Sequence, residues 1–252
     1  KRGEHFFDHA DLMAAFAGEH GLALRGHTLF WSKIKFKADW MREMEGEPLR
    51  EEMRTHVQTI VPRYKDDVIA WDVNNEMLNA RFFEERVGEG IRPEIFKWAH
   101  TAAPDIPLFV NEYSILCEPD RVTAYLELIR DLKAKGAPIG GIGIQEHAAE
   151  RVLRVPSDTN TPERQGVVPL TPEGVWETLD RLHGETGLPI HITEISFRSD
   201  DPAVRGEALD KFFRVAFAHE AVEVLMLWGF WQRSHWLGGQ AALFDRDFHP
   251  LP

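Results

Sequence analysis

Short apolar runs alternate with amphipathic stretches along the chain, and this alternation restricts the possible folds more than any other feature of the sequence. Runs so short and so apolar are typical of parallel strands buried on both faces. We therefore expect βαβ units and a parallel sheet. The predicted strands are Leu22–His27, Val68–Val73, Leu108–Glu112, Gly141–Gln145, Ile190–Ile195 and Glu223–Gly229.

Helical periodicity fills the intervals between these strands. Apolar residues recur there at spacings of three and four, which places them on one face of a helix. Thr171 followed by Pro172 pairs an N-cap residue with proline at the first helical position, and Asp201 and Pro202 repeat that signal. The other predicted helices are Asp8–His20, Leu49–Tyr64, Arg92–Ala102 and Asp120–Lys135.

Two parallel architectures fit this order, an open doubly wound sheet and a TIM-type (β/α)8 barrel. A nucleotide-binding open sheet needs a glycine-rich loop after a strand, but the only candidate, at residues 140–143, lies at the start of one. Polar or aromatic residues instead stand at or just past the carboxyl end of each strand, where barrels build their active sites. These residues are His27, Glu76, Asn111, Gln145, Glu194 and Trp228.

The composition argues against several classes of function. The chain has 252 residues, which suits one α/β barrel, and its formal charge of −12 argues against nucleic acid as a partner. A single cysteine, Cys117, allows neither an intrachain disulfide nor a cysteine zinc cluster. No apolar run is long enough to predict a membrane span.

Two carboxylates are candidates for catalysis. Glu76 ends the segment Trp71–Glu76, in which a strand enters a turn, and Glu194 ends a later strand. Paired carboxylates at the mouth of a barrel suit glycoside hydrolysis, although each could instead be a surface or ion-pair carboxylate. Trp31, Trp228 and Trp236, at or after strand ends, could stack on sugar rings.

The chain resembles glycoside hydrolase family 10, the endo-1,4-β-xylanase family, in six ordered motifs that cover nearly its whole length. The motifs are R-G-H-T-L-F-W at 25–31, W-D-V-N-N-E at 71–76, N-E-Y at 111–113, G-I-G-I-Q-E-H at 141–147, I-T-E at 192–194 and W-G at 228–229, followed by Trp236 and L-F-D at 243–245.

This resemblance implies a TIM barrel and a retaining mechanism on xylan or a related β-1,4-glycan. Glu76 would be the general acid/base, Glu194 the nucleophile, Asn75 a partner of the sugar 2-hydroxyl, and His147 the residue that orients Glu194. A retaining pair places its carboxyl groups about 5–5.5 Å apart. The residues expected to bind substrate are His27, Trp31, Asn111, Tyr113, Gln145, Trp228 and Trp236.

The chain also departs from the family pattern. The second-strand motif E-N-x-M-K-W is absent, so we expect residues 1–252 to form one catalytic domain with strands three to eight, lacking the first two strands and the final helix. Ser196 replaces the aspartate that usually supports the histidine, Ser32 replaces a histidine and Asn74 a valine. Leu237 replaces an arginine.

Two alternatives to the enzyme remain open. A non-catalytic or weakly active carbohydrate-binding barrel would explain the missing motif and Ser196. A metal-dependent hydrolase could use His5 and His9, four residues apart, but H-x-H and H-E-x-x-H are absent. We expect no metal and no cofactor, a polysaccharide or oligosaccharide partner, and, from the family, an extracellular or periplasmic location.

Overall fold

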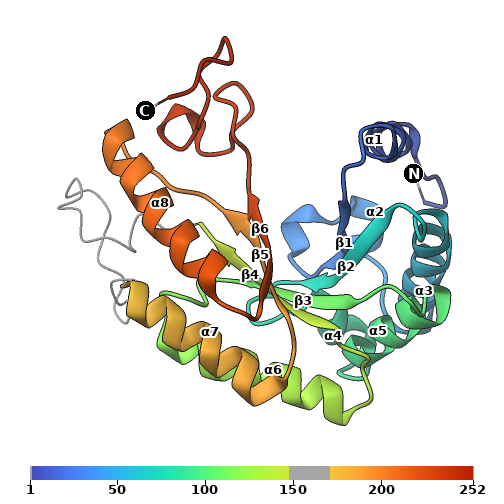
Figure 1. The fold of residues 1–252 in the computed structure, drawn as a ribbon. Coiled ribbons are helices and arrows are strands. Elements are labelled where there is room, and N and C mark those ends of the chain that lie inside the picture. The colour runs from blue at the N-terminus through green and yellow to red at the C-terminus, as the bar shows by residue number, and fades with distance from the viewer. Residues whose placement is uncertain (1, 148–170, 252) are drawn as a thin grey trace. The chain divides into compact units, whose positions relative to one another are not determined.

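The computed structural model describes residues 2–147 and 171–251, in which strands and helices alternate (Figure 1). Every strand pair whose register is defined runs parallel. The strand order is β1-β2-β3-β4-β5-β6, so β1 and β6 are the edge strands of the described sheet. The strands are β1 (Leu24–Trp31), β2 (Val68–Asn75), β3 (Leu108–Tyr113), β4 (Gly141–Glu146), β5 (Ile190–Ile195) and β6 (Val222–Leu227).

The helices confirm the predicted alternation, with two short additions, α2 (Asp39–Arg42) and α4 (Phe82–Val87). Both helices are too short to show a helical period in the sequence. The remaining helices are α1 (Asp8–Glu19), α3 (Gly46–Arg63), α5 (Ile91–Ala102), α6 (Pro119–Ala134), α7 (Pro172–Thr186) and α8 (Pro202–Ala218), with short 3-10 turns at Ile34–Phe36 and Gly238–Gln240.

Both predicted helix starts are confirmed by their caps. The Thr171 hydroxyl accepts a hydrogen bond from the Gly174 N–H at 3.0 Å, and the Asp201 carboxylate accepts one from the Ala203 N–H at 2.9 Å. Each cap satisfies one of the free N–H groups that every helix start presents. The strand β1 is longer than predicted, since it continues to Trp31 and so contains the whole R-G-H-T-L-F-W motif.

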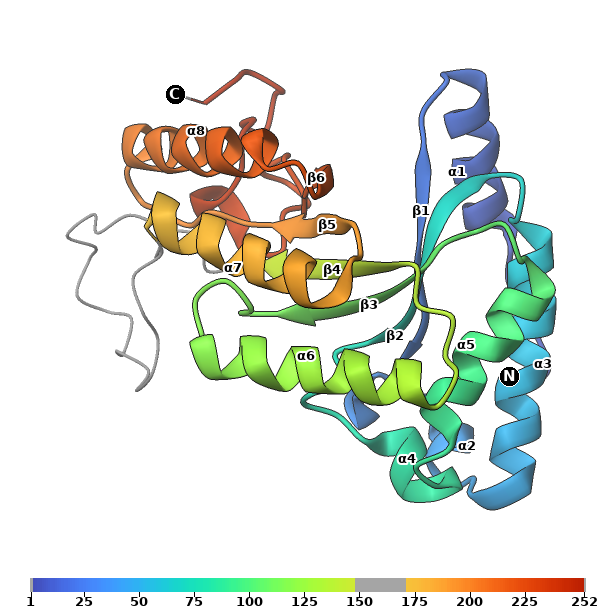
Figure 2. The same cartoon turned by 60° about the horizontal axis from the view of Figure 1, so that its bottom comes forward.

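The chain divides into two compact units, Lys1–Asn111 with Ile129–Gly141, and Glu112–Leu128 with Ile142–Pro252. In the first unit α3 packs on α5 and β1, and Figure 2 shows α3 and α5 side by side. In the second unit α7 packs on α8, and α8 packs on β6. The assignment of residues 1–252 to a single catalytic domain stays a prediction.

Close strand packing below the motif residues depends on Gly26. A Cβ atom there would lie 2.1 Å from the Trp71 indole, so only glycine allows this ring of β2 to lie against the backbone of β1. Trp71 is 5% exposed and belongs to the core. Among the described helices, none has the length and apolar character needed to cross a membrane.

Candidate active site

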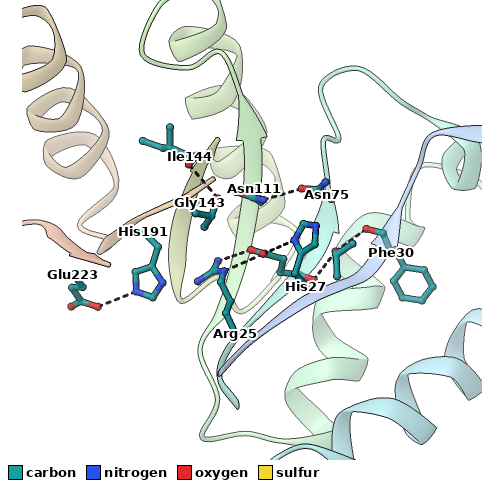
Figure 3. A network of polar contacts seen from close by, with 12 residues as sticks. Arg25, His27, Phe30, Asn75, Asn111, Gly143, Ile144, His191 and Glu223 are labelled. Atoms are coloured by element: carbon teal, nitrogen blue, oxygen red, sulfur yellow. Dashed lines mark hydrogen bonds and ion pairs between the residues drawn. The ribbon is translucent and has the colours of Figure 1, made fainter. Parts of the chain in front are cut away.

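A buried carboxylate, Asp72 on β2, organises the first unit's part of the site. Arg25 donates to it through Nε at 3.1 Å and Nη2 at 2.5 Å, and the His27 Nδ1 lies 3.0 Å from its Oδ2. Arg25 and His27 are two residues apart on β1, so both side chains leave the strand on the same face, and Figure 3 shows them converging. His27 is thereby held in one orientation.

Burial and the two neighbouring donors shift the pKa of Asp72 in opposite directions. Burial alone would raise the pKa of Asp72, but the hydrogen bond from His27 and the positive charge of Arg25 bring the pKa below its usual value of 3.8. Asp72 is fully buried and the Arg25 side chain is 4% exposed. Arg25 and Asp72 therefore form a desolvated ion pair, and replacing either charged group would be costly.

Three residues of the first unit are aligned in register at the carboxyl ends of neighbouring strands. Trp31 is the register partner of Asn75, and Asn75 is the register partner of Asn111. The Asn111 amide donates to the Asn75 side-chain oxygen at 3.0 Å, as Figure 3 shows. One face of Trp31 is stacked on Phe36, with ring centroids 4.0 Å apart, so at most the other face is available to a sugar.

Glu76 follows directly after β2 in a left-handed backbone conformation, with φ of 60°. This conformation is uncommon outside glycine and is frequent at functional sites. The Glu76 N–H donates to the Asn111 carbonyl at 2.9 Å, which fixes the turn against β3. The side chain is 5% exposed and forms an ion pair with Lys33, a contact that the sequence did not indicate.

Two departures from the family pattern meet beneath this turn. The Ser32 hydroxyl donates to the Asn74 side-chain oxygen at 3.3 Å, and both residues are buried. A valine at 74 could not accept this hydrogen bond. The two substitutions are therefore one polar contact between β2 and the segment that follows β1.

Glu194 lies in the second unit at the carboxyl end of β5 and is 4% exposed. Its Oε2 is 3.0 Å from His147 Nε2. His147 Nδ1 lies 3.2 Å from the Ser196 hydroxyl, which also accepts a hydrogen bond from Trp236 Nε1 at 3.2 Å. Trp236, Ser196, His147 and Glu194 thus form one chain of contacts.

The hydrogen-bond partners of His147 indicate which of its two ring nitrogens carries the proton in the neutral imidazole. The indole N–H of Trp236 can only donate, so it occupies one lone pair of the Ser196 oxygen. The Ser196 hydroxyl can still donate to His147 Nδ1, and a neutral imidazole that donates from Nε2 to the Glu194 carboxylate has its Nδ1 lone pair facing that hydroxyl. A neutral imidazole protonated on Nδ1 would set a lone pair of Nε2 against the carboxylate.

The other predicted substrate-binding residues of the second unit lie on or next to strands β3 to β6. Gln145 on β4 is the register partner of Glu194, and the Trp228 N–H donates to the Ile195 carbonyl at 2.9 Å just past β6. Tyr113 lies under the guanidinium of Arg121, 4.4 Å from the ring centroid. Trp236 is 56% exposed, which suits a ring that contacts a ligand.

A metal centre finds no support in the described part of the chain. Within residues 2–147 and 171–251 no group of three or more histidine, cysteine, aspartate or glutamate side chains could hold an ion. His5 precedes α1, which begins at Asp8, so His5 and His9 are not one turn apart on a helix. His5 instead stacks on Phe7, with ring centroids 5.5 Å apart.

Sequence reasoning missed three members of the site. Asp72 and Arg25 stood inside quoted motifs, but only the structure shows that they support His27. A signal was present, because an acid at the centre of an apolar strand needs a partner. Lys33 gave no comparable signal, since it lies in an irregular segment among other lysines.

Replacing Asp72 by asparagine tests the buried cluster. Asp72→Asn removes the buried carboxylate that faces the desolvated Arg25, and we expect the free energy of unfolding at pH 6 to fall by about 3–5 kcal/mol. Urea unfolding followed by circular dichroism measures this. The control is Asp210→Asn on α8, which removes an exposed aspartate paired with Arg214 and should leave the stability unchanged.

The pH dependence of Asp72→Asn follows from the direction of the pKa shift. Because the pKa of Asp72 is lowered by folding, its stabilising contribution is present above pH 3.8 and is lost as the pH falls through the lower value. The gap between the wild type and Asp72→Asn should therefore narrow at acid pH. A gap that stays constant from pH 6 to pH 2.5 would contradict the assigned charge state.

The Ser196 contacts predict a spectroscopic result. We expect His147 to be protonated on Nε2 at neutral pH in ¹⁵N–¹H correlation spectra, with the Trp236 indole N–H exchanging slowly. Ser196→Ala removes the acceptor of that N–H, so its signal should shift and its exchange with water should accelerate, whereas Ser196→Asp should preserve the contact. Ser199→Ala, in the same loop, is the control. Protonation on Nδ1, or an unmoved Trp236 signal in Ser196→Ala, would show that the chain of contacts is wrong.

Comparison with known proteins places this geometry in a family. The model of glycosyl hydrolase family 10 matches residues 1–252. Endo-1,4-β-xylanase 1 of Arabidopsis thaliana is 35% identical over 235 residues, which are 92% of this chain and 23% of that protein. The anti-sigma-I factor RsgI6 of Acetivibrio thermocellus is 32% identical over 243 residues, 96% of this chain and 29% of that protein. The chain thus spans less than a third of the length of these relatives.

Solved structures agree with the sequence comparison. Xylanase 10B of Thermotoga maritima superposes with a TM-score of 0.85 at 28% identity, over 100% of this chain and 78% of that one. Xylanase 10B of Thermotoga petrophila, solved with xylobiose, gives the same TM-score and identity over 77% of its chain. The predicted barrel fold is confirmed, and the six described strands are part of such a barrel. The chain belongs to glycosyl hydrolase family 10.

Proposed function

We propose that this chain cleaves internal β-1,4 linkages of xylan or a related β-glycan with retention of configuration, using Glu76 as acid/base and Glu194 as nucleophile. The observation that carries the proposal is the environment of Glu194, a buried carboxylate aimed by His147 Nε2 at 3.0 Å. Support also comes from family 10 membership and from endo-xylanases among the relatives and neighbours.

In the first step the Glu194 carboxylate attacks the anomeric carbon while Glu76 protonates the glycosidic oxygen. The bond to the leaving sugar breaks, and a glycosyl ester forms on Glu194. The hydrogen bond from His147 to Oε2 fixes the orientation of the Glu194 carboxylate. A nucleophile fixed in this way loses little freedom on reaching the transition state.

In the second step Glu76, now ionised, takes a proton from water as the water oxygen attacks the same carbon. The ester bond breaks and Glu194 is regenerated. Asn75 is suited to contact the sugar 2-hydroxyl, because its side-chain oxygen already accepts from Asn111 and its orientation is therefore fixed. A hydrogen bond to that hydroxyl strengthens as charge develops on the ring.

Substrate contacts are proposed for the aromatic and polar residues that end the strands. The Thermotoga petrophila neighbour was solved with xylobiose, so a short β-linked xylo-oligosaccharide is the natural ligand to expect. Trp31, Trp228 and Trp236 offer flat apolar faces, and His27, Asn111, Tyr113 and Gln145 offer hydrogen-bonding groups.

A glycan-binding protein that turns over slowly or not at all is the second candidate. One relative is named an anti-sigma-I factor, so membership of the family does not by itself require that hydrolysis is the function. Ser196 favours this candidate too, because a neutral hydroxyl replaces the charged support of His147. Turnover decides between the two.

Substitution of the two glutamates tests the proposal. We expect Glu76→Gln and Glu194→Gln each to lower kcat on xylan by about a thousandfold or more, measured as release of reducing ends. A xylobioside with an aryl leaving group, which needs no protonation, should restore bond cleavage to Glu76→Gln but not to Glu194→Gln. Glu177→Gln on α7, an exposed glutamate, is the matched control.

Each outcome separates the candidates. Wild-type turnover in Glu194→Gln would contradict the assigned nucleophile. A wild-type chain that binds xylo-oligosaccharides without releasing reducing ends would instead favour the glycan-binding candidate.

A further inference from the structure

We propose that a cationic cavity next to Glu76 binds the carboxylate of an acidic sugar branch on the glycan. The proposal rests on the proposed function, because it assumes that a β-glycan lies at Glu76. The cavity has a volume of about 370 Å³ and belongs entirely to the first unit. Its lining comes from the segment after β1, from the turn between β2 and α4, and from α4 itself. These residues are Ser32, Lys33, Ile34, Lys35, Asn79, Ala80, Arg81, Phe82, Glu85 and Arg86.

The cavity is a positive site on an acidic protein. Lys33, Lys35, Arg81 and Arg86 line it against the single carboxylate of Glu85, in a chain whose formal charge is −12. An acidic protein repels anions in general, so a local excess of cations marks a place where an anion can approach.

Two of these cations remain available after internal ion pairs are counted. Lys33 pairs with Glu76, and Arg81 pairs with Glu89. For Lys35 and Arg86 no carboxylate lies within ion-pair distance among the described residues. The Lys35 ammonium lies over the ring of Phe36, and the Arg86 guanidinium lies over the ring of Phe82. Arg86 lies 4.8 Å from the centroid of Phe82, which orients its guanidinium.

The rest of the lining suits a sugar rather than a bare inorganic anion. Ile34, which is 53% exposed, presents apolar surface for the C–H face of a ring, and Ala80 and Phe82 form part of the same wall with little exposure. The volume lies within the range of small-ligand pockets, about 300–1,000 Å³. A uronic acid combines a ring with a carboxylate and so matches both parts of the lining.

The cavity is tied to the catalytic turn. The Phe82 N–H donates to the Ser32 carbonyl at 3.3 Å, joining its two walls, and the Asn79 N–H donates to the Glu76 carbonyl at 3.2 Å. Lys33 contacts both the cavity and the Glu76 carboxylate. A branch on a glycan that passes Glu76 would therefore lie next to the cavity.

The test compares a xylo-oligosaccharide carrying one glucuronic acid branch with the same backbone undecorated. In the double variant Lys35→Met/Arg86→Gln we expect kcat/KM for the branched substrate to fall about tenfold, with the undecorated substrate unchanged. The matched control is Lys211→Met/Arg214→Gln on α8, which removes the same two charges from an exposed helix face. Circular dichroism confirms that both variants are folded.

A binding measurement keeps this proposal separate from hydrolysis. Calorimetry in a Glu194→Gln background gives the affinity for both oligosaccharides even if the wild type proves inactive. The branch should strengthen binding about tenfold, and the gain should vanish in Lys35→Met/Arg86→Gln and shrink at high salt. Equal affinities for the two oligosaccharides, or a gain that survives the double variant, would overturn the proposal. Free glucuronate that binds as tightly as the branched oligosaccharide would show a simple anion site instead.

Discussion

Parallel pairing in register is the constraint on which this structure depends. It ends neighbouring strands at the same edge, so residues far apart in the sequence come level there. In the first unit it aligns Trp31, Asn75 and Asn111, and in the second it aligns Gln145 with Glu194. A slip of one residue would turn each of these side chains to the opposite face. The buried ion pair of Asp72 and Arg25 joins β1 to β2 in this arrangement.

The departures from the family pattern are accommodated by hydrogen bonds of neutral groups. Ser32 and Asn74 contact each other, and Ser196 joins His147 to Trp236. The two serine hydroxyls find partners in this way, as buried polar groups require, whereas the buried Nδ2 of Asn74 has no hydrogen-bond partner in the described part of the chain. The hydroxyl of Ser196 still orients His147, but it adds no negative charge beside the imidazole. The support of His147 beside Glu194 is therefore neutral in this chain.

Much of the fold could be predicted because its signals are local. Apolar runs gave all six described strands, and Thr171 and Asp201 gave two helix starts. The short helices α2 and α4 were not predicted, because four and six residues hold too little periodicity. The full length of β1 was not predicted, because polar residues interrupt its apolar pattern. Glu76, Asn75, Glu194 and His147 are predicted as site residues from motifs that bring functional groups to strand ends, and their roles stay predictions.

Contacts across the sheet could not be read from the sequence in the same way. That Asp72 accepts from both Arg25 and His27 depends on the register of β1 against β2. The cationic cavity likewise forms between two separate segments, the one after β1 and the one from β2 into α4. Neither segment predicts a cavity by itself. The ion pair between Lys33 and Glu76 joins those segments to the proposed acid/base.

The central claim is that Glu194 forms a covalent bond to the sugar. Its most direct test is incubation with a 2-deoxy-2-fluoro xylobioside carrying a good leaving group, followed by mass spectrometry of the intact protein and its peptides. We expect one added fluoro-xylobiosyl group per chain, on the peptide that contains Glu194, and none in Glu194→Gln. Labelling of another residue would contradict the assigned nucleophile, and hydrolysis of xylan with no trapped intermediate and inverted product would contradict the double displacement.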